Sequence, residues 1–89
     1  MNSYTTRRFR RLFAQLPGAV QRQAREAYRR FCREPFHPSL RFRRVHAARA
    51  IYSVRISLAY RALGIQERDE IVWFWIGSHA DYDKMLAQQ

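Results

Sequence analysis

The chain has 89 residues, of which 47% are hydrophobic and 15% aromatic, with three glycines and three prolines. This composition excludes a disordered chain, and no apolar run approaches the roughly 18 residues that cross a bilayer. We therefore expect one globular domain over residues 1–89 and no contact with a membrane. The N-terminal stretch lacks an apolar segment of the signal-peptide type, and the single cysteine, Cys32, suits a reducing compartment. These features predict a cytoplasmic protein.

Arginine dominates the charge of the sequence. The net charge is +10, the pI is about 11.2, and all of the 17 basic residues except Lys84 are arginine. A guanidinium group can bind phosphate through two parallel hydrogen bonds, and so basic a domain predicts a polyanion or an acidic protein as partner. The alternative is a compositional bias that leaves the charge on a solvated surface.

The N-terminal half predicts a pair of helices. Residues 2–5 are short and β-prone, which suits an edge strand. Thr6 is a suitable N-cap for a first helix with apolar residues at helical spacing: Phe9, Leu12, Phe13 and Leu16. Pro17-Gly18 ends that helix, and a second helix runs from about 19 to 33, with Glu26 at ion-pair spacing from three arginines. Its apolar stripe consists of Val20, Ala24, Ala27, Tyr28, Phe31 and Cys32.

The C-terminal half predicts four strands, over residues 41–46, 51–58, 60–66 and 70–77, and a short helix that begins near Ser78 or Asp81. The last strand contains the apolar run 71–76, which predicts an interior strand covered on both faces. Strand alternation places Trp73 and Trp75 on one face and Phe74 on the other, and we expect residues 73–76 to be largely buried.

The order of these elements predicts the fold class. Helices that precede a series of hairpin strands are typical of an α+β domain. We expect a 3–5-stranded antiparallel sheet with the helices on one face, namely an N-terminal αα-hairpin packed on the sheet and a short C-terminal helix.

A set of side chains that can handle phosphate lies near the last two hairpin strands. Arg55 and Arg61 flank one turn, and His79 and Tyr82 follow the end of the last strand. Cleavage of RNA through its own 2′-hydroxyl needs a base, cations that stabilise the phosphorane, and an acid for the leaving oxygen. Arginine suits the second task, and histidine or tyrosine the others. Purely structural roles are the alternative: an ion pair for Arg55, a helix start for His79, and the core for Tyr82.

Other chemistries find no support in the residue pattern. There is no nucleotide-binding loop, zinc-ligand spacing or nucleophile elbow. His37, His46 and His79 do not form a metal-ligand pattern with Cys32. We therefore expect no metal and no other cofactor.

The register of the strands around residue 58 decides whether Arg55 and Arg61 can act together. Opposed residues of an antiparallel pair share a face, so Arg55 must lie opposite Arg61. Leu58-Ala59 is a poor two-residue turn, because such turns favour Gly, Asn or Asp. We therefore expect an odd-length loop or a bulge, with both guanidinium groups and His79 around one phosphate-sized space.

The order of an αα-hairpin, SVRI, YRAL and an apolar strand ending in IGSHADYD resembles the RelE/ParE superfamily of bacterial toxins. The resemblance covers residues from about 4 to 86. It implies a toxin of a type II toxin–antitoxin system, neutralised by a cognate antitoxin. RelE-type members cut mRNA in the ribosomal A site, whereas ParE-type members inhibit DNA gyrase without cleaving RNA.

The resemblance also assigns candidate site residues. It places catalytic roles on Arg61, Arg55, His79 and Tyr82. The lysine pair or glutamate of some members is missing before Arg55, where this chain has Arg43, Arg44, His46 and Arg49. We therefore include His46 as a candidate base and the three arginines as candidate RNA contacts. The resulting hypothesis is a metal-independent endoribonuclease that acts on mRNA at the ribosome and contacts ribosomal RNA, with a ParE-like gyrase inhibitor as the alternative.

Overall fold

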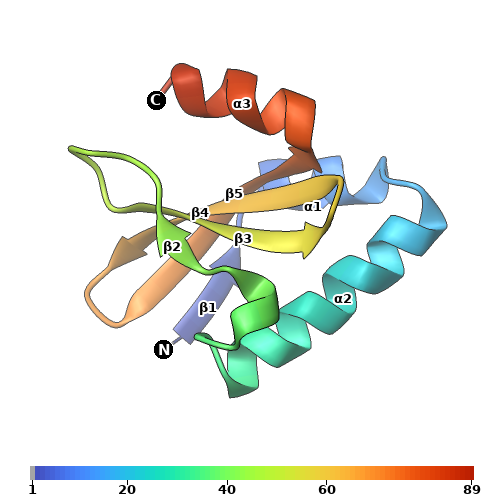
Figure 1. Ribbon diagram of the computed structural model, residues 1–89, viewed down its shortest axis with the longest axis horizontal. Coiled ribbons are helices and arrows are strands. Elements are labelled where there is room, and N and C mark those ends of the chain that lie inside the picture. Colours follow the sequence, from blue (N-terminus) through green and yellow to red (C-terminus); the bar gives the residue numbers. More distant parts are fainter. Residues whose placement is uncertain (1) are drawn as a thin grey trace.

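Five strands form one sheet in the order β1-β5-β4-β3-β2, in a computed structural model that describes residues 2–89 (Figure 1). The elements are β1 (Asn2–Thr5), α1 (Arg7–Ala14), α2 (Gly18–Arg33), the 3-10 helix η1 (Pro38–Leu40), β2 (Arg43–Arg44), β3 (Ile51–Ser57), β4 (Tyr60–Glu67), β5 (Glu70–Ser78) and α3 (His79–Ala87). The predicted α+β class is confirmed. The sheet is antiparallel except at one edge, where β1 pairs with β5 in parallel, a pairing that strand alternation could not predict.

The helical hairpin forms as the sequence predicts, with two exceptions on α2. Thr6 caps α1 by accepting the backbone N–H of Phe9 at 3.1 Å. Val20, Ala24, Ala27 and Phe31 are the buried residues of α2. Tyr28 and Cys32 are exposed, so the predicted stripe was too wide. Tyr28 instead lies along the surface, where its hydroxyl donates to the carbonyl of Ser3 at 3.3 Å.

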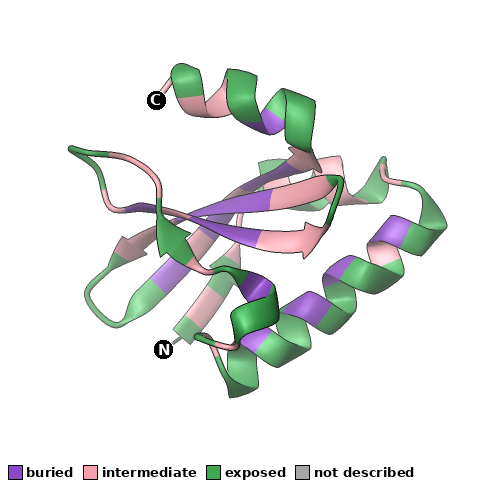
Figure 2. Ribbon diagram, viewed as in Figure 1, coloured by how far each residue is buried: buried purple, intermediate pink, exposed green. Residues whose placement is uncertain are grey.

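The two faces of the sheet carry separate apolar clusters (Figures 1 and 2). On one face, α1 and α2 pack on the sheet, and the cluster there includes Phe31 of α2 with Ile71 and Trp73 of β5. On the other, α3 covers Ile51, Leu63 and Trp75, and Tyr82 belongs to that cluster. The prediction that the helices lie on one face is therefore wrong for α3. Since both faces are covered, β4 and β5 are interior strands with apolar residues on each side.

A bulge in β5 changes the predicted facing of its aromatic residues. Leu63 lies opposite Trp75 and Gly64 opposite Trp73, so Phe74 has no partner in β4. The extra residue shifts the alternation, and Trp73 and Trp75 consequently join opposite clusters, whereas the sequence placed them on one face. Trp73, Trp75 and Ile76 are at most 5% exposed. Phe74 is more exposed than these three residues but still mostly covered, so the run is largely buried, as expected.

The strand predicted over residues 41–46 is reduced to the two residues of β2. Arg41 has φ of 47°, in the left-handed region, where it ends η1 and turns the chain. Because β2 pairs only with Tyr52 and Ser53, the rest of β3 is left as an open edge. No helix within residues 2–89 is both long and apolar enough to span a membrane.

Candidate functional site

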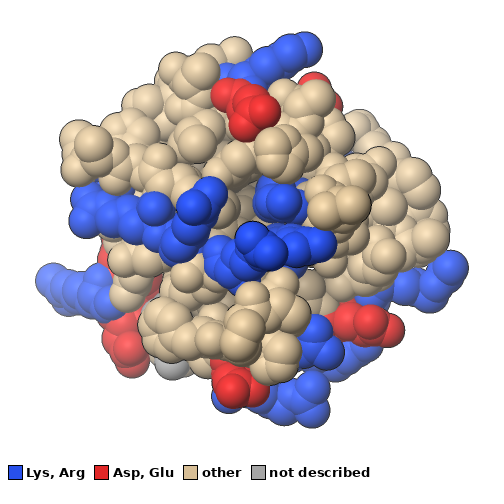
Figure 3. All heavy atoms as spheres, in the orientation of Figure 1, with Lys and Arg blue, Asp and Glu red and all other residues tan. Residues whose placement is uncertain are grey.

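Five of the predicted site residues meet in one cavity of about 300 Å³ on the α3 side of the sheet. Figure 3 shows this face of the molecule, with basic side chains around a hollow at its centre. The residues that line the cavity are Arg41, Phe42, Arg43, Ser53, Arg55, Arg61, His79 and Tyr82. Four of these eight are arginines and none is a carboxylate, so the cavity is a cationic site suited to an anion.

A second bulge brings the two central arginines together. Arg55 lies directly opposite Arg61, but the next pair toward the turn is Ser57 with Tyr60, so Ile56 is unpaired. The turn itself has only Leu58 and Ala59 at its centre, and neither has a positive φ. The predicted register is thereby confirmed, through a bulge rather than a longer loop. Both arginines line the cavity together with His79 and Tyr82 of α3.

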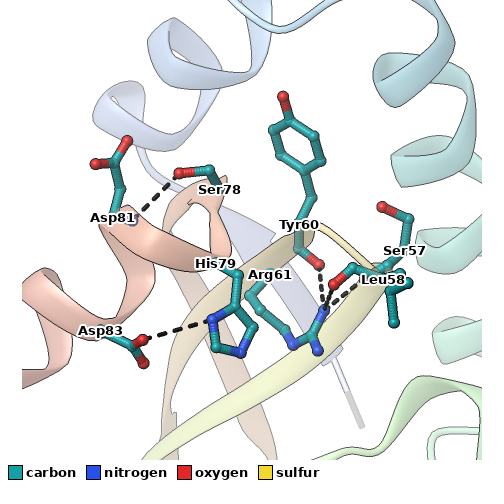
Figure 4. Close-up of polar contacts among 8 residues, drawn as sticks. All are labelled: Ser57, Leu58, Tyr60, Arg61, Ser78, His79, Asp81 and Asp83. Carbon is teal, nitrogen blue, oxygen red and sulfur yellow. Dashed lines mark hydrogen bonds and ion pairs between the residues drawn. The ribbon is translucent and has the colours of Figure 1, made fainter.

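Arg61 is held against the β3–β4 turn. Its Nη1 donates to the carbonyl oxygens of Ser57 at 2.5 Å and Tyr60 at 2.9 Å (Figure 4). Burial lowers the pKa of Arg61, the positive charge of Arg55 lowers it further, and Tyr82 acts in the opposite direction. A guanidinium stays protonated despite such a shift. Arg61 is therefore a fixed positive charge, oriented by the backbone and poorly compensated by its neighbours.

His79 joins the cavity from the junction of β5 and α3. Its backbone N–H donates to the carbonyl of Ala59 at 2.8 Å, which ties the start of α3 to the β3–β4 turn. The Ser78 hydroxyl caps α3 by accepting the N–H of Asp81 at 3.2 Å, as the sequence predicted. Figure 4 shows the imidazole beside Arg61, with Nδ1 at 3.5 Å from Oδ2 of Asp83.

Asp83 is a site residue that sequence reasoning missed. Its i, i+4 spacing from His79 on a predicted helix was the available signal. A carboxylate beside Nδ1 favours the tautomer with its proton on Nδ1, and it leaves Nε2 as the proton acceptor. Nε2 has no hydrogen-bond partner among residues 2–89. Both side chains are largely exposed, at 50% and 67%, so this contact orients the imidazole only weakly.

Tyr82 lies both in the core and at the site, the two alternatives that the sequence left open. It is 7% exposed and packs in the cluster beneath α3, yet it also lines the cavity. Its ring lies edge-on to the His79 ring, with 5.6 Å between the ring centres. Of the candidate RNA contacts, Arg43 lines the cavity as well.

The remaining candidates lie outside the cavity, with Arg44 at the end of β2 and His46 and Arg49 in the loop between β2 and β3. Nδ1 of His46 accepts the backbone N–H groups of Ala48 at 3.1 Å and Arg49 at 2.9 Å. Nε of Arg44 donates to the His46 carbonyl at 3.1 Å. These contacts shape the loop. They also occupy the lone pair of Nδ1, which a neutral imidazole would need free in order to act as a general base. Within residues 2–89, no three His, Cys, Asp or Glu side chains lie close enough together to hold a metal ion.

Comparison with solved structures shows that toxins share this fold at low sequence identity. The RelB–RelE antitoxin–toxin complex from Methanococcus jannaschii contains a chain with a TM-score of 0.75 and 11% identity, covering 92% of this chain and 96% of that one. The YoeB/ParE toxin from Agrobacterium tumefaciens has a TM-score of 0.70 and 13% identity, covering 89% and 99%. YafQ from E. coli has a TM-score of 0.73 and 5% identity, covering 91% and 96%.

Comparison with sequences identifies the family. No curated protein matches the chain. A family model described as a ParE-like toxin domain matches residues 18–84, which include α2, the whole β2–β5 sheet and the start of α3. Because that match spans most of the chain, the protein belongs to the family of ParE-like toxin domains.

Proposed function

We propose that this protein is the toxin of a type II toxin–antitoxin system and cleaves mRNA at the ribosome. The observation that carries the proposal is the cationic cavity, which is lined by four arginines together with His79 and by no carboxylate. A phosphodiester in that cavity would supply the missing negative charge. The structural likeness to RelE, YoeB and YafQ toxins supports the assignment at the level of the fold.

The proposed reaction uses the 2′-hydroxyl of the substrate as the nucleophile. Nε2 of His79 takes the 2′-hydroxyl proton while the 2′-oxygen attacks phosphorus. The bond from phosphorus to the 5′-oxygen breaks, and the Tyr82 hydroxyl protonates that oxygen. The products are a 2′,3′-cyclic phosphate and a free 5′-hydroxyl. Arg55 and Arg61 stabilise the extra negative charge of the phosphorane, as fixed cations do in preorganised sites.

We also propose that an acidic antitoxin binds the toxin in the groove between α1, α2 and the sheet. The groove has a volume of about 390 Å³ and mostly apolar walls, among them Phe9 and Phe13. Arg10, Arg25 and Arg29 line it as well. An amphipathic segment with acidic flanks matches both features, and it would offset part of the net charge of +10.

Inhibition of DNA gyrase is the second candidate function. The description of the matching family as ParE-like favours it. In that case the arginines would contact a protein surface or DNA rather than a scissile phosphate, and no RNA would be cut. A supercoiling assay with purified gyrase distinguishes this function directly.

The decisive experiment maps mRNA 5′ ends after induced expression. We expect the wild-type protein to produce new 5′ ends inside reading frames and Arg61→Ala to produce none, since it removes the central cation. Arg22→Ala, an exposed change on α2 outside the cavity, is the matched control and should behave as wild type. No new ends, together with loss of supercoiling, would favour gyrase inhibition. A fully toxic Arg61→Ala His79→Ala double variant would contradict the nuclease.

A further inference from the structure

A second cavity adjoins the cationic cavity across the open edge of β3. It has a volume of about 400 Å³ and lies between α2, η1 and the end of β3. Arg55 lines both cavities. Ser57 also connects the two cavities. Its carbonyl oxygen accepts a hydrogen bond from Arg61, which lines the first cavity, and Ser57 itself lines the second. Figure 1 shows η1 and α2 side by side along this edge. A ligand whose phosphate binds Arg55 can therefore extend into the second cavity.

The second cavity differs from the first in its chemistry. Leu40 and Ile56 provide apolar surface, whereas Gln23, Ser39 and Ser57 provide hydrogen-bond donors and acceptors. Such a mixture suits a flat heterocycle, whose faces are apolar and whose edge carries polar atoms. Two arginines, Arg30 and Arg55, also line this cavity, but Glu26 offsets one of the charges and Arg30 donates to Ser39, so the cavity is less cationic than the first.

Glu26 is the distinctive residue of this cavity. Arg30 lies one helical turn away and lines the same cavity, but its Nη1 donates to the Ser39 hydroxyl at 3.0 Å. That hydroxyl also lies 2.8 Å from Nδ1 of His37, so the three side chains form a connected set. The Glu26 carboxylate consequently forms no ion pair within residues 2–89, and the pairing predicted from helical spacing is wrong. An acceptor-only group thus remains free at the cavity wall.

We propose that the second cavity binds the nucleobase adjacent to the scissile phosphate and that Glu26 selects bases with an exocyclic amino group. This inference rests on the proposed RNA cleavage. Guanine, adenine and cytosine each have an exocyclic amino group that can donate a hydrogen bond to a carboxylate. Uracil has carbonyl oxygens in place of these amino groups, and its N3–H donor lies between two oxygens that a carboxylate repels. Glu26 would then determine specificity, because it contacts the base next to the scissile phosphate and not the reacting atoms themselves.

The first test compares the wild type with Glu26→Gln and Glu34→Gln by mapping mRNA 5′ ends. Glutamine keeps the shape and helix propensity of glutamate, but its amide can donate to a uracil oxygen. We expect the wild type to disfavour uracil at one position beside the cut and Glu26→Gln to reduce that discrimination by roughly tenfold. Glu34, the exposed C-cap of α2, lies outside both cavities, so Glu34→Gln makes the same change in charge without the effect.

The second test measures binding without cleavage. Cytidine and uridine monophosphates share the ribose and phosphate and differ only along one edge of the base. Cytosine has an amino group at C4 and an unprotonated N3, whereas uracil has a carbonyl at C4 and an N3–H, so the two form a matched pair of probes. We expect the wild type to bind the cytidine nucleotide more tightly by about tenfold, and Glu26→Gln to bind both alike. Equal binding by the wild type, or unchanged base frequencies in Glu26→Gln, would overturn base selection by Glu26. Absence of any cleavage by the wild type would instead refute the proposed function.

Discussion

The arginines of the cationic cavity should destabilise the fold, and Arg55→Gln should therefore raise the melting temperature. Arg55 lies directly opposite Arg61 in a cavity without carboxylates. The pKa of Arg61 is lowered by burial first, and then by the positive charge of Arg55. A basic group with a lowered pKa in the folded state is disfavoured in its protonated form. The penalty starts to fall only when the pH rises through the pKa of the folded state, and it is gone above the pKa of the unfolded state, so it is constant around neutral pH.

The expected size of the effect follows from the cross-strand geometry. Directly opposed charged pairs change stability by about 0.2–1 kcal/mol. For a domain of this size, 1 kcal/mol corresponds to about 4–8 °C, so Arg55→Gln should melt about 1–8 °C higher than the wild type. Calorimetry at low salt measures the difference. In about 1 M NaCl the Debye length falls to about 3 Å, and the difference should shrink.

Two further measurements connect this stability change to anion binding. Arg29→Gln removes the same charge from an exposed position in the middle of α2, outside the cationic cavity, and should change stability by less than about 0.5 kcal/mol. Inorganic phosphate should raise the melting temperature of the wild type more than that of Arg55→Gln, because it binds only the folded cavity. A lower melting temperature for Arg55→Gln, or a gain that salt leaves unchanged, would refute like-charge repulsion as the cause.

Three other predictions concern the core and the partner. Gly64→Ala should destabilise the protein by about 1–3 kcal/mol in urea titrations, because the added Cβ would lie 2.7 Å from Cε3 of Trp73 and 3.0 Å from Cγ1 of Ile71; a neutral result would mean that the indole can move aside. Phe74→Ala should cost less than the roughly 3–5 kcal/mol expected for Trp73→Ala, since Phe74 is more exposed than Trp73, and equal losses would contradict the bulge. Association with an acidic antitoxin should slow as salt rises, measured by stopped-flow mixing, whereas a rate insensitive to salt would indicate an apolar interface.

The elements of this fold follow from local patterns, because helix and strand periodicities depend on near neighbours in the chain. The cap at Thr6, the helix break at Pro17-Gly18 and the interior strand β5 were all predicted in this way. The placement of His79 directly after β5 was predictable for the same reason. The sequence also indicated that so many arginines needed an anionic partner.

Only the tertiary structure decided which side chains share a face. One unpaired residue in a strand reverses the alternation beyond it, and the bulges at Ile56 and Phe74 follow from packing rather than from residue type. The first bulge places Arg55 opposite Arg61, and the second separates Trp73 from Trp75. The parallel pairing of β1 with β5 joins the two ends of the chain, which no local pattern can specify. The sequence therefore determined the elements and the charge, and long-range packing determined how they form a site.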